Sequence, residues 1–357
     1  MIKVTLIPDK YLSEDEWKKA FVNKLGNLFN NVDISFQELK EEYDGWSGIP
    51  KYKGIREYSG NPSEVANLAK NAEILVVQFA PVSKEVFDRA EKLKLIACNR
   101  STPLNIDVKA ATEKNIPVIY APGRNADSVA DFTIGLLLAE VRHIARAFEA
   151  VRNGTYPSCR ESWRKSIPEL RDNIIGIVGF GKIGRKVAER AKGFGMKIIA
   201  YDPFVPEEIM KEYGVEKVDL NTLLQTSDFV TIHVKLTPET SNLIGEKELS
   251  LMKKTAFLVN TSRGEIIDED ALYNALVGKK IAGAALDVFT HEPIYKDPNF
   301  KFVHLNNVTF TPHIAGPSDE MFYRGACIIA EDVAKFLRGE KMENILNPEV
   351  FLHKKEK

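Results

Sequence analysis

The sequence has few cysteines, no excess of charge of one sign and no long apolar run. Its three cysteines, Cys98, Cys159 and Cys327, lie far apart in the chain, and no two of them have zinc-ligand spacing. This pattern predicts neither a disulfide framework nor a bound metal. It favours a reducing compartment, and we expect a cytoplasmic protein.

Charge and hydropathy exclude further classes of protein. The 49 basic residues nearly balance the 50 acidic ones, so the basic excess typical of nucleic-acid and anionic-membrane binding is missing. The longest apolar run, around residues 132–141, is shorter than a membrane span, and the opening residues show no export signal. We therefore expect a small-molecule ligand, and neither a nucleic-acid nor a membrane partner.

A chain of 357 residues is long enough for two packed domains. Short runs rich in Val and Ile alternate with helical patterns, which is typical of parallel strands joined by crossover helices. The pattern predicts an α/β fold with two parallel sheets, the second buried on both faces. The predicted strands lie within residues 2–7, 32–36, 73–79, 93–99 and 117–122, then within 173–181, 197–203, 228–234, 255–262, 281–289 and 307–313.

Several predicted helices have recognisable ends. Ser13 and Glu16 have the spacing of a capping box, and Asp107 precedes another helical stretch as a candidate cap. Residues 128–154 keep helical apolar spacing over an unusually long stretch, which predicts one long helix, containing His143, that ends before Gly154. Such a helix would serve between lobes or between subunits.

A glycine-rich turn joins the predicted strand at 173–181 to an amphipathic helix. Gly179, Gly181 and Gly184 form a GxGxxG sequence. In a dinucleotide site the first glycine makes the tight turn, and the second lets the backbone approach the pyrophosphate. The third lets the helix pack on the strand, and the helix N-terminus faces the phosphates. The alternative is a plain strand-to-helix turn.

Asp202 ends the next predicted strand, where a carboxylate can accept hydrogen bonds from the ribose hydroxyls of an adenosine. The same carboxylate would repel a 2′-phosphate, and Pro203, Phe204 and Val205 offer no cation to bind one. NAD is therefore predicted as the cofactor in preference to NADP. The alternative is that Asp202 is a solvated strand end.

Three further motifs, NTSRGEI, ALDVFTHEP and TPHIAG, follow predicted strands in order. With the glycine turn, they resemble the D-isomer-specific 2-hydroxyacid dehydrogenases, a family that includes phosphoglycerate dehydrogenases and glyoxylate or hydroxypyruvate reductases. The resemblance covers nearly all of the chain. It implies hydride transfer between NAD and the alpha carbon of a small D-2-hydroxy or 2-keto acid.

The resemblance implies three catalytic residues, Arg263, Glu292 and His313. Hydride transfer from a carbinol carbon also requires removal of the hydroxyl proton, and an imidazole can take that proton near neutral pH. Glu292 would raise the pKa of His313 and orient its ring, while Arg263 would hold the substrate carboxylate and carbonyl oxygen. The structural alternative is a surface ion pair for Arg263, a charge in a loop for Glu292 and a polar cap for His313.

The resemblance also implies contacts with the cofactor. Asp287 would hold the nicotinamide carboxamide, and Thr261 and Ser262 would line the cofactor through their backbone. His233 is interpreted as structure of the cofactor loop, and Val129 is a candidate contact whose alternative is a core position. The remaining predicted contacts are Lys182, Ile183 and Gly316.

The loop CNRSTPLNID stands where relatives bind the substrate carboxylate through a glycine-rich backbone. Here Arg100, Ser101 and Thr102 occupy positions where the family has glycines. The added cation and hydroxyl, with Arg124 nearby, suggest a polyhydroxylated or anionic acid such as a sugar acid or phosphoglycerate. The alternative is that Arg100 pairs with a structural carboxylate.

The resemblance implies two Rossmann-like, doubly wound parallel-sheet domains with a cleft between them. One is a discontinuous, flavodoxin-like substrate-binding domain, residues 1–121 and 317–357, and the other is an NAD-binding Rossmann domain, residues 122–316. The last amphipathic pattern, at 322–336, has no strand partner and would return to the first domain. Family habit and the long helix favour a homodimer, and no appended regulatory module is expected. The alternative function is an NAD(H)-sensing, corepressor-like binding protein. A formate dehydrogenase is disfavoured because those relatives have glutamine at the position of Glu292.

Overall fold

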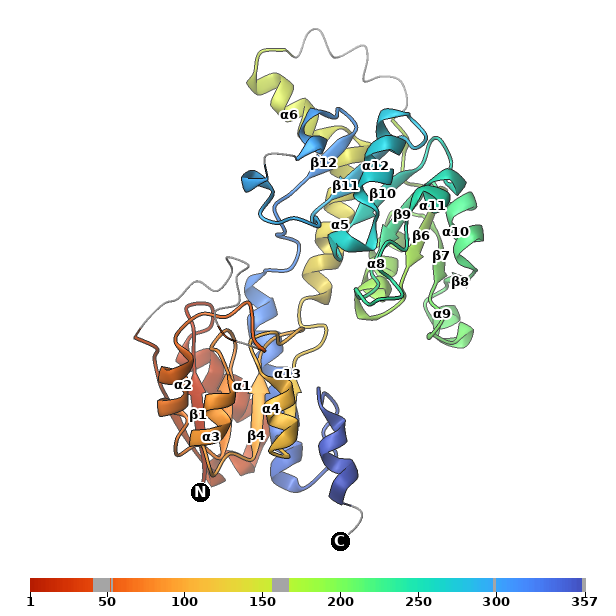
Figure 1. Cartoon of the computed structure of the whole chain (residues 1–357). Helices are drawn as coiled ribbons and strands as arrows, with labels where there is room; N and C mark the ends of the chain where they lie inside the picture. The colour runs from red at the N-terminus through yellow and green to blue at the C-terminus, as the bar shows by residue number, and fades with distance from the viewer. Residues whose placement is uncertain (41–51, 53, 156–166, 298–299, 355–357) are drawn as a thin grey trace. The chain divides into compact units, whose positions relative to one another are not determined.

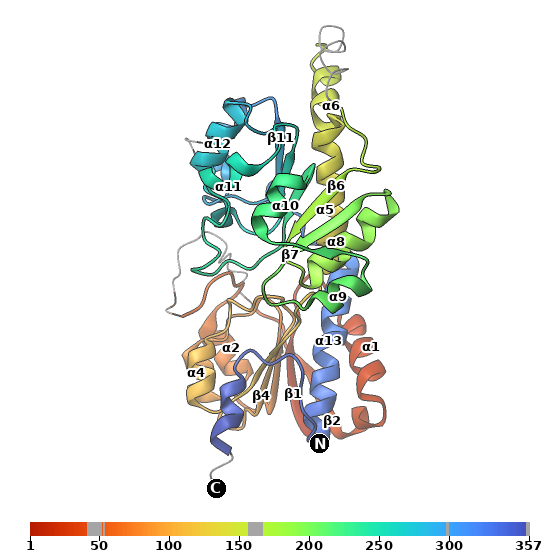
Figure 2. The ribbon, with the colours of Figure 1, turned by 90° about the vertical axis from the view of Figure 1, so that its right-hand side faces the viewer.

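The structure is a computed structural model that describes residues 1–40, 52, 54–155, 167–297 and 300–354, so Cys159 lies outside the described residues. The chain divides into two compact units (Figures 1 and 2). The first unit contains Met1–Arg124 and Ser318–Lys357, and the second contains Asn125–Pro317.

The first unit is a parallel sheet between two layers of helices. Its described strands run in the order β2-β1-β3-β4-β5. They are β1 (Ile2–Ile7), β2 (Val32–Phe36), β3 (Ile74–Val77), β4 (Leu95–Cys98) and β5 (Val118–Tyr120). The α-helices are α1 (Glu14–Leu25), α2 (Pro62–Leu68), α3 (Lys84–Arg89), α4 (Val108–Glu113) and α13 (Asp319–Arg338), with short 3-10 helices at Gly26–Asn31 and Pro348–Lys354.

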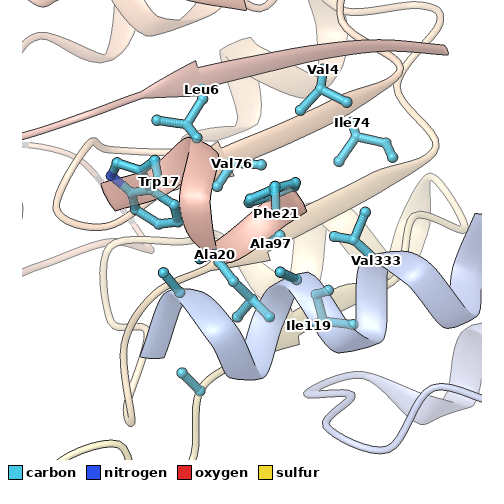
Figure 3. Packing of buried hydrophobic residues seen from close by; sticks show 14 of the residues in the cluster. Val4, Leu6, Trp17, Ala20, Phe21, Ile74, Val76, Ala97, Ile119 and Val333 are labelled. Carbon is cyan, nitrogen blue, oxygen red and sulfur yellow. The ribbon is translucent and has the colours of Figure 1, made fainter. Parts of the chain in front are cut away.

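Alternate residues of these strands face different helices, as the period of a strand requires. Leu6 belongs to the core formed with α1 and α13, whereas its neighbour Ile7 belongs to the core formed with α2, α3 and α4. Figure 3 shows Trp17 and Phe21 of α1 beside the sheet, with Val333 of α13 in the same layer. The last helix therefore completes one face of a sheet formed by the start of the chain.

Local capping chemistry fixes the starts of two helices in this unit. The Ser13 side chain accepts a hydrogen bond from the Glu16 N–H, and Glu16 Oε2 accepts one from the Ser13 N–H, which completes the predicted capping box. Asp107 Oδ1 accepts from the Ala110 N–H at 3.0 Å. Both predicted caps are confirmed.

The second unit is also a three-layer structure, with described strands in the order β12-β11-β10-β9-β6-β7-β8. They are β6 (Ile174–Val178), β7 (Lys197–Tyr201), β8 (Glu216–Lys217), β9 (Phe229–Ile232), β10 (Phe257–Asn260), β11 (Gly283–Leu286) and β12 (Val308–Phe310). One helical layer contains α5 (Ala126–Val141) and α8 (Lys182–Gly193), and the other contains α10 (Leu220–Thr226), α11 (Glu246–Leu251) and α12 (Glu269–Val277). The remaining helices are α6 (Ile144–Arg152) and α9 (Glu207–Glu212), with 3-10 turns at Gly264–Ile266, Ile294–Lys296 and Lys301–His304.

The predicted long helix over 128–154 is wrong, because the chain forms two helices, α5 and α6. His143 lies between them with φ 58° and ψ 29°, a left-handed conformation that ends an α-helix. The break follows Glu140, a buried carboxylate that accepts hydrogen bonds from Thr309 Oγ1 and Arg146 Nη1, both at 2.7 Å. Apolar spacing continues across the break, so the sequence pattern did not reveal it.

The predicted fold class is confirmed: each described sheet is parallel and doubly wound, with helices on both faces. Within the described segments, no helix combines the length and apolar character needed to cross a membrane.

Candidate functional site

The glycine turn lies at the point where the strand order of the second sheet reverses. From β6 the chain proceeds to β7 on one side and later to β9 on the other, so the carboxyl ends of β6 and β9 are neighbours. Gly179 follows β6, and His233 follows β9. Doubly wound sheets bind ligands at such a switch point, outside the carboxyl ends of the strands.

The structure gives a different reason for glycine at each of the three positions of the turn. Gly179 has φ 95°, and a Cβ there would lie 2.8 Å from the carbonyl carbon of His233. A Cβ at Gly184 would lie 2.2 Å from the Gly179 carbonyl oxygen, whereas a Cβ at Gly181 would meet no described atom within 4 Å. Close packing therefore requires glycine at 179 and 184. The backbone at Gly181 stays open, which fits the approach of a pyrophosphate.

Asp202 links the end of β7 to this turn. Its Oδ2 accepts a hydrogen bond from the Phe180 N–H at 2.8 Å, and its Oδ1 accepts one from the Phe204 N–H at 2.9 Å. The side chain is partly exposed, so the carboxylate can still accept bonds from a ribose. One nearby cation was not expected from the sequence. Lys217 lies in β8, a two-residue strand that the pattern did not reveal, and its Nζ donates to the Val205 carbonyl at 2.6 Å.

His233 is held beside the glycine turn by its backbone and its ring. Its N–H donates to the Val178 carbonyl at 2.7 Å, and Nε2 lies 2.9 Å from Thr231 Oγ1. Burial lowers the pKa of His233 to about 3, so the ring is neutral near pH 7. Nδ1 is buried with no hydrogen-bond partner among the described residues. This geometry suits a role in supporting the turn.

The other predicted cofactor residues differ in exposure. Val129 is buried in α5, while Lys182 is exposed and Ile183 half-buried in the first turn of α8. The Gly316 carbonyl accepts a hydrogen bond from Ser128 Oγ at 2.6 Å. These positions stay predictions as cofactor contacts.

Asn260, the last residue of β10, shapes the loop that carries Arg263. Its Oδ1 accepts from the Ser262 N–H at 3.0 Å, and its Nδ2 donates to the Arg263 carbonyl at 2.9 Å. A Cβ at Gly264 would lie 2.1 Å from the carbonyl carbon of Phe289, so this loop packs directly on the segment after β11. Neither role, that of Asn260 or that of Gly264, was expected from the sequence. The available signal was a polar residue at the end of an otherwise buried apolar strand.

Thr261 and Ser262 are also fixed in this loop. The Thr261 hydroxyl lies 2.9 Å from the Thr133 hydroxyl of α5, and Ser262 Oγ donates to the Val234 carbonyl at 2.5 Å. The loop is therefore tied to α5 and to the residues after β9.

Glu292 and His313 form a hydrogen-bonded pair, with Nδ1 of His313 2.7 Å from Oε2 of Glu292. Because an ionised carboxylate only accepts, Nδ1 carries the hydrogen of this bond. Oε1 of Glu292 accepts from the Phe289 N–H at 3.0 Å, which orients the carboxylate.

The hydrogen bond to Glu292 raises the pKa of His313 above its ordinary value, although partial burial and the Arg263 charge act against it. Burial acts to raise the pKa of Glu292, but the hydrogen bonds from His313 and Phe289 lower it on balance. Arg263 is close enough that its charge lowers both pKa values. The second unit alone therefore brings together the three predicted catalytic side chains.

Asp287 holds the chain around His313. It is buried at the end of β11, and its carboxylate accepts hydrogen bonds from Thr311 Oγ1 at 2.5 Å and from the Ile314 and Ala315 N–H groups at 2.9 Å. Its carbonyl accepts from the His313 N–H at 2.8 Å. His313 has φ 57°, a left-handed conformation that needs such support. The contacts of Asp287 in this structure are thus with the His313 segment.

In the first unit, the buried Arg100 side chain of the predicted substrate loop forms an ion pair with Glu57, which lies outside that loop and is partly exposed. Nη2 of Arg100 lies 2.6 Å from Oε2 of Glu57, and Nη1 donates to the Glu57 carbonyl at 2.6 Å. Pairing with a structural carboxylate was the alternative to a direct substrate contact for Arg100. Ser101 Oγ donates to the Ala121 carbonyl at 3.3 Å, and Thr102 is exposed.

A doubly wound sheet with an open glycine turn, a carboxylate at the next strand end and a hydrogen-bonded His–Glu pair beside an arginine define a nicotinamide-dependent dehydrogenase. The family described as D-isomer specific 2-hydroxyacid dehydrogenase, NAD binding domain, matches residues 134–315.

Comparisons with individual proteins agree with this match. D-3-phosphoglycerate dehydrogenase of Methanocaldococcus jannaschii is 44% identical over 286 residues, 80% of this chain but 53% of that protein, so the chain spans about half of its length. Glyoxylate reductase of Korarchaeum cryptofilum is 45% identical over 273 residues, 76% of this chain and 81% of the reductase. A solved D-lactate dehydrogenase from Sporolactobacillus sp. is 27% identical with a TM-score of 0.72, covering 97% of this chain and 99% of that one.

The chain belongs to the D-isomer specific 2-hydroxyacid dehydrogenases, which are NAD-dependent oxidoreductases. The predicted family, enzyme class and cofactor are confirmed. The corepressor alternative has no support, because the relatives above are named for enzymatic activities.

The glycine turn gives the first testable prediction. Gly181→Ala should leave folding intact but weaken NADH binding about tenfold or more, because its Cβ points into space that the cofactor would use. Gly184→Ala should instead lower the unfolding temperature, because its Cβ would overlap the Gly179 carbonyl oxygen. NADH fluorescence titration and thermal melting measure the two effects. Equal affinity of Gly181→Ala and the parent protein for NADH would contradict the assignment.

Proposed function

We propose that the protein transfers a hydride between NAD and the alpha carbon of a small D-2-hydroxy or 2-keto acid, with His313 as the acid–base group. The observation that carries this proposal is the 2.7 Å hydrogen bond between His313 and Glu292, with the Arg263 charge acting on both. The family match supplies the reaction class.

The tautomer of His313 follows from its partner. Since Nδ1–H donates to Glu292, Nε2 is the atom left to exchange a proton with substrate. In the reductive direction, protonated His313 gives the Nε2 proton to the carbonyl oxygen of the keto acid, which becomes the hydroxyl. In the oxidative direction, neutral His313 takes that proton back at Nε2, and Glu292 stabilises the resulting imidazolium.

Arg263 is exposed beside this pair, and its Nη1 donates to the Ser262 carbonyl at 2.7 Å. That bond fixes one side of the guanidinium and leaves other donors for the carboxylate and carbonyl oxygens of a 2-keto acid. The bound cofactor supplies the hydride or accepts it. The residues proposed to hold it are the open backbone at Gly181, the Asp202 carboxylate and the first turn of α8.

We assign cofactor binding to the second unit and substrate recognition to the first. The relatives are named for phosphoglycerate and glyoxylate, so the candidate substrates are short 2-keto acids, with or without a hydroxyl or phosphate group. The pairing of Arg100 with Glu57 favours a role for Arg100 in shaping the loop, with Ser101 and Thr102 as the substrate contacts. We also propose a cytoplasmic location, which the free thiols of Cys98 and Cys327 suit.

The central test is reduction of a panel of 2-keto acids with NADH by the purified protein. His313→Ala should lower kcat by about 100-fold or more, because the proton donor is lost, while NADH affinity stays near that of the parent. His304→Ala, at an exposed histidine outside the site, is the matched control and should keep full activity. Normal turnover by His313→Ala, or no reduction of any acid by the parent protein, would contradict the proposal.

The second test is the pH dependence of the reductive kcat/KM. This direction needs protonated His313, so the rate should fall as pH rises through the raised pKa of His313. Glu292→Gln removes the interaction that raises this pKa, and the alkaline limb should therefore move to lower pH. Glu91→Gln, at an exposed position of the first unit, should leave the limb in place. An unchanged limb in Glu292→Gln would exclude His313 as the titrating group.

We further propose a homodimer formed through α6. Ile144, Phe148 and Val151 share one face of this helix and are 55%, 67% and 59% exposed, and no residue of α6 is buried. An exposed apolar face of this kind is costly in water and is typical of a subunit contact.

Phe148→Glu should convert the dimer to a monomer, because it places a charge at the centre of the apolar face. Glu149→Gln, on the same helix, should leave the dimer intact. Size-exclusion chromatography with light scattering gives the molecular mass of each variant. A monomeric parent protein, or a dimeric Phe148→Glu, would rule out this interface.

A further inference from the structure

Phe204 has the most exposed large apolar side chain in the described part of the second unit, at 91%. The two aromatic residues next in exposure have an explanation, because the Lys296 ammonium lies over the Tyr295 ring and Phe148 belongs to the apolar face of α6. Within the described residues, the Phe204 ring has neither a cation nor a second ring against it. A single exposed apolar residue is ordinary, so its place in the fold decides its meaning.

The backbone of Phe204 lies against the Asp202 carboxylate, just after β7. Oδ1 of Asp202 accepts the Phe204 N–H at 2.9 Å, while Oδ2 accepts the N–H of Phe180 in the glycine turn at 2.8 Å. The carboxylate therefore joins the glycine turn to the segment that carries Phe204. This segment lies at the carboxyl edge of the second sheet, because β7 pairs in parallel with β6.

The loop that carries Phe204 is held in one shape from several directions. Pro203 and Pro206 flank it, and each proline ring fixes its own φ and restricts the residue before it. Lys217 of β8 donates its Nζ to the Val205 carbonyl at 2.6 Å, and the Val205 side chain packs on the core that contains α5 and α8. The loop backbone and Val205 are thus fixed, whereas the Phe204 ring next to them is left in solvent.

An apolar ring that a fixed loop holds in solvent is suited to bind a ligand. The exposed ring gains free energy when it is covered. The fixed backbone removes much of the entropy that a mobile loop would lose on binding. A flat aromatic group laid on this ring would therefore gain stacking and apolar burial without rearrangement of the loop.

We propose that the Phe204 ring stacks on the adenine of the bound dinucleotide and forms an apolar wall of the adenine site. This inference rests on the proposed function, because it adds a residue to the cofactor site of the same enzyme. In adenosine the base is attached to the ribose carbon next to the one that carries the 2′-hydroxyl. A ribose held by Asp202 through its hydroxyls brings the base within a side-chain length of Phe204, whose amide nitrogen lies 2.9 Å from that carboxylate.

The chemistry of this segment favours the base over the other parts of the cofactor. A pyrophosphate needs N–H donors, and the Phe204 N–H is already used by Asp202. The nicotinamide carboxamide needs hydrogen-bond partners, which a phenyl ring does not have. Adenine presents two flat π-faces, and stacking on an aromatic side chain tolerates many arrangements of the polar edge of the base.

The test measures the binding of NADH, of AMP and of reduced nicotinamide mononucleotide, which separate the two halves of the cofactor. Phe204→Ala should weaken the binding of NADH and AMP about tenfold, because stacking is lost, and leave that of the mononucleotide unchanged. Isothermal titration calorimetry gives each dissociation constant. In steady-state assays the KM for NADH should rise about tenfold, and kcat should not fall, since adenine takes no part in hydride transfer.

Two further substitutions at Phe204 identify the kind of contact. Phe204→Tyr keeps the aromatic face and should bind all three ligands as the parent protein does. Phe204→Leu keeps apolar bulk without an aromatic face and should lose several-fold in AMP affinity. Phe194→Ala is the matched control, because Phe194 is 42% exposed at the end of α8 opposite the glycine turn, and it should leave all three constants unchanged.

The stability of the variants and the pattern of losses separate the outcomes. The exposed ring makes little contact with the fold, so Phe204→Ala should keep the unfolding temperature of the parent protein. Unchanged AMP affinity in Phe204→Ala or Phe204→Leu, or equal losses for AMP and the mononucleotide, would overturn the stacking contact while keeping the proposed function. A changed molecular mass of Phe204→Ala in solution, with AMP affinity unchanged, would assign the ring to a subunit contact instead. A parent protein that binds no NADH would overturn the proposed function and this inference together.

Discussion

The carboxylate of Asp287 is the constraint on which the candidate catalytic geometry depends. It holds a hydroxyl and two backbone N–H groups of the segment around His313, and this support keeps His313 in a left-handed conformation. Asp287 in turn donates its own N–H to the carbonyl of Asn260, whose side chain shapes the Arg263 loop. Adjacent strand ends thus position the base and the cation through one continuous set of hydrogen bonds.

The same principle operates at both switch points. In the second sheet, glycines allow the backbone after β6 to pack on the residues after β9, and the space at Gly181 remains open. In the first sheet, polar side chains gather after β1, β3 and β4, and some of their buried atoms have no hydrogen-bond partner within the described residues. A parallel sheet brings such residues together because all its strands end at one edge, whatever their separation in the chain.

The sequence predicted the features whose causes are local. Strand periodicity, the Ser13 capping box and the glycine turn each depend on residues a few positions apart, and all were found where expected. The features it missed depend on distant residues. The sequence offered a structural carboxylate as an alternative partner for Arg100 but could not identify Glu57, which lies in another loop. The helix break at His143 lies beside Glu140, whose carboxylate accepts a hydrogen bond from the distant Thr309. Apolar spacing contains no information about either contact.

Asp202 has two roles that are difficult to separate. The carboxylate proposed to discriminate between the two nicotinamide cofactors also holds the N–H groups of Phe180 and Phe204, and so supports the turn itself. A variant that prefers the phosphorylated cofactor cannot simply lose the Asp202 carboxylate. A replacement must also satisfy two backbone donors, so a change in coenzyme preference is coupled to the integrity of the loop and should require compensating substitutions nearby.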